Sequence, residues 1–224
     1  MSTYIISDIH GCNLTFRKAL KKVALKKTDN LILLGDLIDR GNDSKGVLDT
    51  IILLRQHGFN VRCIKGNHEQ MLIDALNGAF EKVQWIRNGG KQTLQSFLTS
   101  DVSGIPKNYI ELINSFEDYF LFDNYIFVHA GLNMTLENPL EDKHSLLWLR
   151  DWKSTYNKEW LGDRILIHGH TPIKYLQIEE QLKATDLQVW GIDSGVYLRP
   201  EDGYGKLCIL ELESKRILFQ NNIE

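Results

Sequence analysis

Three alternations of a short apolar run with a helix-like segment open this chain, and they constrain its fold more than any other feature. Residues 3–7, 31–34 and 60–64 are short and apolar, as buried strands are. The segments that follow them, 13–24, 44–54 and 69–76, repeat apolar residues at helical spacing. This alternation predicts an α/β fold with parallel strands joined by right-handed crossovers. In such sheets small-molecule sites lie beyond the carboxyl ends of the strands.

The rest of the chain predicts a second sheet. Residues 78–118 are mainly helical and polar, whereas the segments after them contain few long helices. Expected strands cover 119–122, 125–128, 164–167, 188–192, 206–212 and 216–220, the first two of them forming a hairpin. Packing of a second sheet on the first would account for so many strands. Because no repeat, low-complexity segment or linker interrupts the chain, we expect a single domain over 1–224.

Two local signals refine the expected helices. Asn13 precedes the first amphipathic segment, whose expected apolar face is Phe16, Leu20, Val23 and Ala24. Asparagine favours the N-cap of a helix, and so does serine at Ser44, before the second segment. We therefore expect Asn13 and Ser44 to cap these two helices.

The bulk composition excludes several classes of protein. Hydrophobic residues make up 43% of the 224 and charged residues 25%, and the formal net charge is −3. No global basic field is present to recruit nucleic acid or an anionic membrane. No secretory signal and no apolar run near the ~20 residues of a membrane span is visible. The expectation is a cytoplasmic protein that binds neither nucleic acid nor membrane.

The cysteines predict no disulfide framework. Cys12, Cys63 and Cys208 are odd in number and widely spaced, and no pair has CxxC spacing. We expect all three to be reduced. Cys12 lies close to the polar motifs below, but nothing pairs it with a base, which argues against a nucleophilic cysteine.

Five polar motifs follow predicted strands. They are Asp8-Ile9-His10-Gly11, Gly35-Asp36-Leu37-Ile38-Asp39-Arg40-Gly41, Lys65-Gly66-Asn67-His68-Glu69, His129-Ala130-Gly131 and His168-Gly169-His170-Thr171. Each motif alone has an ordinary structural explanation, such as an Asx-turn, a solvated ion pair, a helix start or a packed histidine. Together they gather histidine, carboxylate and amide side chains beyond apolar strands. That ligand mixture suits Mn²⁺, Fe or Zn²⁺.

These motifs resemble those of the phosphoprotein phosphatase family within the calcineurin-like metallophosphoesterases. Their order and spacing match from residue 8 to residue 171, and GNHE following GDxxDRG is highly specific. The chain is most similar to the compact bacterial and phage-lambda serine/threonine phosphatases. The resemblance implies two packed mixed β-sheets flanked by helices, an α/β/β/α sandwich.

Carried over position by position, the resemblance also implies roles for individual residues. The first metal ion is bound by Asp8, His10 and Asp36, and the second by Asp36, Asn67, His129 and His170. The general acid is His68, oriented by Asp39, and the phosphate-binding arginines are Arg40 and Arg150. His168 matches none of the family motifs and is expected to support or pack beside Gly169-His170, and Lys65 replaces an arginine of the lambda type.

A dinuclear site of this kind suits phosphate ester hydrolysis. Two divalent cations ~3.5–4 Å apart bind the phosphoryl oxygens and lower the pKa of a bridging water to roughly 7. The expected cofactors are two divalent metal ions, Mn²⁺ first and Fe or Zn as alternatives. The expected route is direct attack of the bridging hydroxide without a phosphoenzyme, while His68 protonates the leaving oxygen.

The substrate stays open between two classes. The favoured activity is hydrolysis of phosphoserine and phosphothreonine, and also phosphotyrosine, in proteins. The alternative is hydrolysis of diadenosine tetraphosphate or another small nucleotide phosphoester at the same metal site. The two differ in the pocket walls, expected within 78–108 and 133–162. A third hypothesis, an inactive binding module, is disfavoured because every expected ligand and the acid are present. We expect a monomer whose partner is a phosphorylated protein or a small phosphoester.

Overall fold

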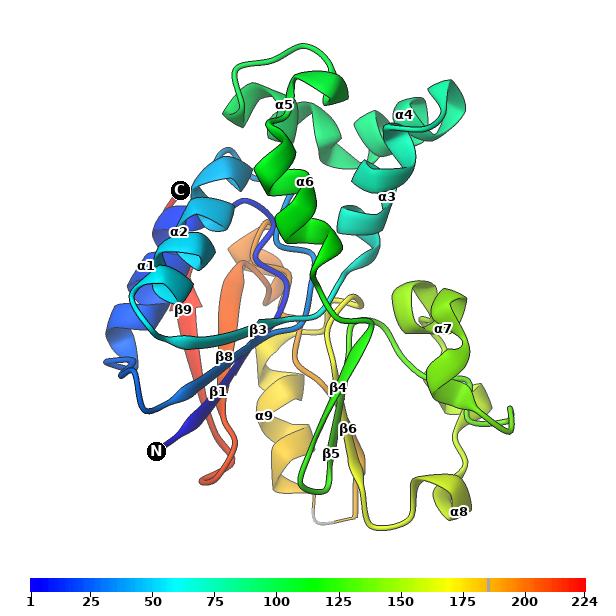
Figure 1. Ribbon diagram of the computed structural model, residues 1–224. Helices are drawn as coiled ribbons and strands as arrows, with labels where there is room; N and C mark the ends of the chain where they lie inside the picture. The colour runs from blue at the N-terminus through cyan, green and yellow to red at the C-terminus, as the bar shows by residue number, and fades with distance from the viewer. Residues whose placement is uncertain (185) are drawn as a thin grey trace.

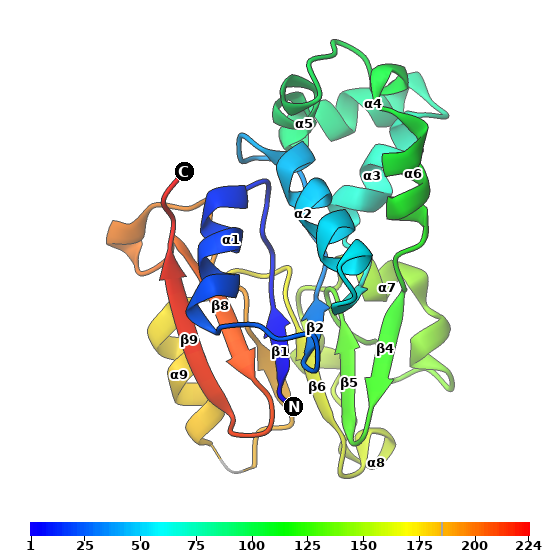
Figure 2. The same cartoon turned by 60° about the vertical axis from the view of Figure 1, so that its left-hand side comes forward.

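Two β-sheets form the centre of the computed structural model, which describes residues 1–184 and 186–224. The first sheet has the strand order β3-β2-β1-β8-β9 (Figures 1 and 2). Its strands are β1 (Thr3–Ile6), β2 (Asn30–Leu33), β3 (Asn60–Cys63), β8 (Lys206–Glu211) and β9 (Arg216–Asn221). Strands β1, β2 and β3 are parallel, as the alternation of strands and helices predicts, and β8 pairs antiparallel with both β1 and β9.

The second sheet has the order β4-β5-β6-β7. Its strands are β4 (Tyr119–Phe122), β5 (Tyr125–Val128), β6 (Ile165–His168) and β7 (Val189–Gly191). The predicted hairpin of β4 and β5 is confirmed as an antiparallel pair, whereas β5, β6 and β7 run parallel. The polar motifs after β5 and β6 therefore leave neighbouring strands at the same edge of this sheet.

The two sheets pack face to face through one apolar cluster. Ile5 and Ile32 from the first sheet meet Phe127, Ile167 and Trp190 from the second, and all five are buried. Alternate residues of β1 and β2 point the other way, which is why these strands are apolar on both faces. The expected α/β/β/α sandwich of two mixed sheets is confirmed.

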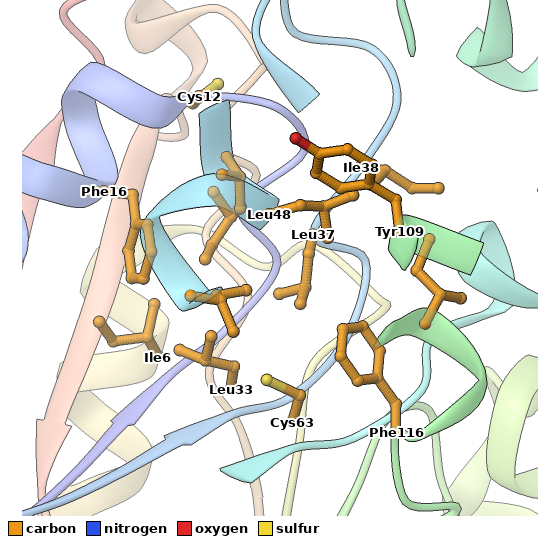
Figure 3. Packing of buried hydrophobic residues seen from close by; sticks show 14 of the residues in the cluster. Ile6, Cys12, Phe16, Leu33, Leu37, Ile38, Leu48, Cys63, Tyr109 and Phe116 are labelled. Atoms are coloured by element: carbon orange, nitrogen blue, oxygen red, sulfur yellow. The ribbon is translucent and has the colours of Figure 1, made fainter. Parts of the chain in front are cut away.

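Helices cover the outer face of the first sheet. Helices α1 (Asn13–Lys22) and α2 (Ser44–Gln56) pack there on a second apolar cluster. Figure 3 shows Phe16 and Leu48 from these helices directed toward Ile6 and Leu33 of the strands. Of the expected face of α1, Phe16 and Leu20 are buried, but Val23 ends the helix and Ala24 lies exposed beyond it.

A group of helices after β3 projects above the sheets in Figures 1 and 2. It comprises α3 (Asn67–Ala75), α4 (Ala79–Trp85), a kinked turn (Ile86–Gly90), α5 (Lys91–Ser96), a 3₁₀ turn (Val102–Gly104) and α6 (Lys107–Asn114). The prediction of a mainly helical segment over 78–118 is confirmed. The chain kinks in the turn Ile86–Gly90, where Gly89 has φ of +111°, and this turn lies next to the site described below.

Short helices complete the second half of the chain. They are α7 (Lys143–Trp148), α8 (Lys158–Leu161), α9 (Tyr175–Lys183) and the 3₁₀ turns Pro139–Glu141, Trp152–Thr155 and Pro200–Asp202. The strand-rich character expected for this half is confirmed. Within the described ranges, no helix is both long and apolar enough to cross a bilayer.

Both expected N-caps are wrong. Cys12 occupies the cap of α1, and the Asn13 side chain instead bonds Asp43 and Thr50. The cap of α2 is Asp43, whose carboxylate accepts the backbone N–H of Gly46 at 2.9 Å. Ser44 is the first helical residue, and its hydroxyl is engaged by the loop after β2. Local propensity was overridden in both cases by longer-range hydrogen bonds.

Candidate metal centre and active site

The polar motifs leave the strands through strained backbone. Among the described residues, nine besides glycine have positive φ, and five of these are predicted site residues: His10, Asp36, Asp39, Arg40 and His170. Residues other than glycine adopt positive φ at an energetic cost. Such conformations recur at functional sites, where surrounding contacts hold the backbone in place. The strain thus concentrates where the sequence predicts chemistry.

One set of ligand atoms converges around His129. The Nδ1 of this buried ring lies 2.8 Å from the Leu34 carbonyl oxygen, which can only accept, so Nδ1 carries the proton. Its Nε2 therefore presents a lone pair, and it lies 3.0 Å from Asn67 Oδ1, 3.2 Å from His170 Nδ1 and 3.3 Å from Asp36 Oδ1. Four residues predicted for one metal ion meet at this point.

A second set converges around the other oxygen of Asp36. His10 Nδ1 lies 3.1 Å from the Ile38 carbonyl oxygen, which leaves the lone pair of Nε2 facing Asp36 Oδ2 at 3.6 Å. His68 Nε2 lies 3.9 Å from the same oxygen. The two triads that could hold a metal ion are His10–Asp36–His68 and Asp36–His129–His170. Asp36 is common to both, as a bridging carboxylate must be.

These donor atoms suit two cations. Lone pairs of histidine, amide and carboxylate face one another in a buried space, an arrangement that repels itself unless a positive charge lies between them. Neutral imidazole is also the form that binds metal, and burial lowers the pKa values of His10 and His170 well below the usual range. The chemistry of the site therefore fits the expected dinuclear centre.

Asp8 is placed differently from the other predicted ligands. It is buried beside the site, but it belongs to neither triad. Both of its carboxylate oxygens lie 3.1 Å from the backbone nitrogen of His170, and Ser7 donates to Oδ1 at 3.0 Å. The structure thus links the loops after β1 and β6 through Asp8, and its role as a metal ligand stays a prediction.

The predicted acid and its partner form a buried pair. His68 Nδ1 lies 2.7 Å from Asp39 Oδ2, and both side chains are essentially without solvent exposure. Because Nδ1 is engaged, Nε2 is the atom left to face the convergence at Asp36. Burial lowers the pKa of His68 and raises that of Asp39 to about 7, while hydrogen bonds from Thr93 and Trp85 act against the latter rise.

Glu69 ties the loop after β2 to the start of α3. Its Oε2 accepts the backbone N–H of Asp36 and of Gly66, both at 2.9 Å, and its Oε1 accepts those of Leu37 and Ile38. The side chain is fully buried, which raises its pKa to about 7. One carboxylate therefore holds four backbone donors in two site loops.

The two predicted arginines differ in their surroundings. Arg40 is half-buried, with its guanidinium carbon 4.3 Å from the centre of the Tyr197 ring. Tyr197 in turn packs edge-on against the His10 ring at 4.7 Å. Arg150 is exposed and donates to the His170 carbonyl oxygen at 3.4 Å. Arg150 thus contacts a residue of the candidate metal centre directly, whereas Arg40 is linked to it through Tyr197.

Four residues of this site were missed from the sequence: Glu69, Trp85, Thr93 and Tyr197. Glu69 stands three residues after Gly66, a capping-box spacing that predicts its bond to Gly66 but not those to the loop after β2. Trp85 lies outside the polar motifs, and packing is the simplest explanation of a tryptophan in a helical segment. No sequence signal indicated Thr93 or Tyr197, because their contacts join elements far apart in the chain.

The remaining titratable residues near the site have defined surroundings. His168 is buried, which lowers its pKa to about 4, and its Nδ1 faces the Gly169 carbonyl oxygen at 3.0 Å. Burial raises the pKa of Cys12 to about 12, which disfavours a thiolate there as expected. All three cysteines are free, and the histidines outside the polar motifs, His57 and His144, are exposed.

Sequence comparisons agree with this geometry. The family model described as calcineurin-like phosphoesterase matches residues 1–198. A serine/threonine-protein phosphatase 1 of Salmonella typhimurium is 40% identical over 178 residues, which cover 76% of this chain and 79% of that protein. A symmetrical bis(5'-nucleosyl)-tetraphosphatase of Nitrosomonas europaea is 34% identical over 133 residues, 59% of this chain and only 45% of that enzyme.

Solved structures share the fold. A Saccharomyces cerevisiae protein serine/threonine phosphatase superposes with a TM-score of 0.67 at 14% identity, covering 100% of this chain and 81% of that one. At this identity the likeness concerns the arrangement of strands and helices alone.

Proposed function

The chain belongs to the calcineurin-like phosphoesterase family, and on that premise we propose that it hydrolyses phosphoserine and phosphothreonine monoesters in proteins. The family's chemistry requires a dinuclear divalent metal site, and this chain has ligand groups for one. The observation that carries the proposal is that the His68–Asp39 pair lies beside the candidate metal ligands around Asp36. The lone pairs around Asp36 face one another, and His68 Nε2 lies beside them with Nδ1 held by Asp39.

We assign the side chains as follows. Asp8, His10 and Asp36 would hold one cation, and Asp36, Asn67, His129 and His170 the other. When bound, the two cations would offset phosphoryl charge and make water a competent nucleophile near neutral pH. Manganese is the proposed metal, and iron and zinc are the alternatives. Mixed histidine, carboxylate and amide ligands suit all three.

Protein side chains supply the remaining steps. Arg40 and Arg150 would bind phosphoryl oxygens through charge-assisted hydrogen bonds. His68 would give the proton on Nε2 to the leaving oxygen, since an alkoxide of serine or threonine is a poor leaving group. Asp39 keeps the proton of the neutral ring on Nδ1 and stabilises the imidazolium that must form before Nε2 can donate.

A phosphoprotein substrate is favoured by the extent of the match to the Salmonella phosphatase, which spans most of both chains.

A second candidate function, hydrolysis of dinucleoside polyphosphates, is supported by a separate observation. A pocket of about 290 Å³ adjoins Arg150 and is lined by Trp152, Lys153, His168 and Thr171 among others. An aromatic wall and two cations beside the phosphoryl site would suit a nucleotide extending from the cleaved phosphate.

One comparison separates the two substrates. Hydrolysis of a phosphoserine peptide and of diadenosine tetraphosphate would be measured at equal enzyme concentration with Mn²⁺, with chelator and with the Asp36→Asn variant as controls. The proposal expects metal-dependent turnover that favours the peptide. Preference for the dinucleotide would transfer the assignment to the second candidate. Absence of metal-dependent turnover of both would contradict the proposed chemistry.

A further inference from the structure

The carboxylate of Asp39 is surrounded by donors from the helices above the sheets. Trp85 Nε1, at the end of α4, lies 2.9 Å from Oδ2 and 3.1 Å from Oδ1, and the Thr93 hydroxyl in α5 donates to Oδ1 at 2.6 Å. With His68 Nδ1 at 2.7 Å from Oδ2, both oxygens are engaged. Asp39 and Thr93 are 0% exposed, so bulk water does not compete for these bonds.

Thr93 holds the backbone of Asp39 as well as its side chain. The backbone N–H of Asp39 donates to the hydroxyls of Thr93 and Ser44, both at 3.0 Å, and those two hydroxyls lie 2.9 Å apart. Asp39 has φ of +70°, a conformation that a residue with a side chain keeps only when its surroundings fix it. Ser44, which was expected to cap α2, thus forms with Thr93 a clamp on the Asp39 backbone.

The kinked turn Ile86–Gly90 brings the two donors to the same carboxylate. Trp85 precedes this turn and Thr93 follows it, so the turn sets the angle between α4 and α5. Gly90 lies directly under the Trp85 indole, where a Cβ would overlap the ring. The Gly89 carbonyl oxygen also accepts the backbone N–H of Arg40 at 3.3 Å. The segment therefore wraps the Asp39–Arg40 turn from one side.

We propose that Trp85 and Thr93 are positioning residues for proton transfer, which hold Asp39 so that it fixes the His68 ring with Nε2 directed at the leaving oxygen. A carboxylate that holds an imidazole in one tautomer and orientation needs its own fixed geometry, and these two donors supply it. This inference rests on the proposed role of His68 as general acid. The side-chain hydrogen bonds of both residues go to Asp39 and its clamp rather than to the candidate metal ligands.

The test compares leaving groups. Thr93→Val removes the hydroxyl with little change of shape, and Trp85→Phe removes the indole N–H together with part of the buried ring. The rate constant kcat would be measured on phenyl phosphate, whose leaving group resembles tyrosine with a pKa of about 10, and on p-nitrophenyl phosphate, whose leaving group is more acidic. A poor leaving group needs the proton more. We expect about a tenfold loss of kcat on phenyl phosphate, equivalent to the ~1.4 kcal/mol of one buried hydrogen bond.

The loss on p-nitrophenyl phosphate is expected to be much smaller, with KM and metal content unchanged. Thr93→Ser keeps the hydroxyl and should restore the rate on phenyl phosphate. Thr28→Val is the matched control, because Thr28 is exposed and lies outside the polar motifs and the expected pocket walls. A second readout is ¹⁵N NMR of the His68 ring in metal-free protein, where the variants should lose the single Nδ1–H tautomer expected of the unsubstituted protein.

Several outcomes would overturn the inference. Equal losses on both substrates, or loss of metal, would mean that the two residues serve only the general structure. His68→Asn separates this failure from failure of the proposed function. If the loss of kcat in His68→Asn depends strongly on the leaving group and the losses in the Thr93 and Trp85 variants do not, only the positioning role is wrong. If His68→Asn itself shows no such dependence, the acid assignment fails. Thermal unfolding identifies a misfolded variant, and the second variant then carries the test.

Discussion

Glu69 Oε2 accepts the backbone N–H of Asp36 at 2.9 Å, across 33 residues of sequence. The contact joins the start of α3 to the loop after β2, and it holds the residue shared by both candidate metal triads. Since Asp36 also has φ of +49°, its backbone needs such a partner. A residue that binds neither metal nor substrate in our assignment thus fixes the centre of the site.

Replacement of Glu69 by glutamine is expected to destabilise the protein. Each carboxylate oxygen accepts two backbone N–H groups, and the amide nitrogen of glutamine would face one such pair without accepting from it. Two buried donors left unsatisfied should cost about 2 kcal/mol or more. Chemical denaturation of metal-free protein measures this. Glu111→Gln, in an exposed pair with Lys107, is the control and should change stability by under about 0.5 kcal/mol. Similar effects of both substitutions would refute the prediction.

Substitution of His68 and of Asp36 should separate catalysis from metal binding. His68→Asn is expected to lose most activity and keep its metal, since Nδ1 is committed to Asp39 and Nε2 is assigned to proton transfer. Asp36→Asn should lose metal, because its two oxygens face both triads. Elemental analysis of the purified variants provides the measurement. A metal-free His68→Asn variant would instead make His68 a ligand of the His10–Asp36–His68 triad.

Metal affinity should rise with pH and then level off near pH 7. Burial raises the pKa of Asp36 to about 7, so in metal-free protein this carboxyl holds a proton at lower pH and a metal ion must displace it. Affinity therefore falls as pH drops below 7, by up to about tenfold per pH unit for one displaced proton. His170 adds little, because its pKa is lowered and its ring is already neutral. Calorimetric titration with Mn²⁺ between about pH 6 and pH 8 tests this. An affinity independent of pH over this range would contradict it.

Alanine at Gly89 should weaken phosphate binding. Gly89 has φ of +111°, and a Cβ there would lie 2.8 Å from Arg40 Cγ and 2.9 Å from its backbone nitrogen. The expected result is a raised KM and a loss of roughly 1–2 kcal/mol in stability from the strained backbone. Gly58→Ala is the matched control: Gly58 has φ of +79°, but a Cβ there would meet no atom of the described residues within 4 Å. Gly58→Ala should lose similar stability with unchanged kinetics, and an unchanged KM for Gly89→Ala would count against the contact.

The ring of Tyr197 should matter for phosphate binding more than its hydroxyl. The Arg40 guanidinium lies over this ring, a contact worth roughly 0.5–1 kcal/mol where partly exposed, or about two- to fivefold in affinity. Tyr197→Leu should therefore raise the inhibition constant of inorganic phosphate by that factor, and Tyr197→Phe should leave it nearly unchanged. If both variants weaken phosphate equally, the hydroxyl and not the ring positions Arg40.

Much of the fold and of the site could be predicted from the order of residues alone. Strands β1, β2 and β3 are short apolar runs between helical repeats, and that alternation predicts their parallel pairing. The polar motifs fall where those strands end, so their convergence follows from the geometry of parallel sheets. These features are local in sequence or repeat regularly, which is why they can be recognised without a structure.

Other features depend on contacts between distant segments. Asn13 and Ser44 have the composition of N-caps, but tertiary hydrogen bonds to Asp43 and to the Asp39 turn use their side chains instead. The positive φ of Asp36 and Asp39 could not be predicted either, because both conformations are fixed by groups from α3 and α5.

The sequence by itself determined the sheet of parallel strands, the family resemblance and which side chains meet beyond the strand ends. Only the tertiary structure decided how those side chains are held: Glu69 under the loop of Asp36, and Trp85 and Thr93 around Asp39. The physical reason is that a strand or helix is encoded by spacing within about ten residues, whereas a hydrogen bond to a buried carboxylate depends on where separate elements pack.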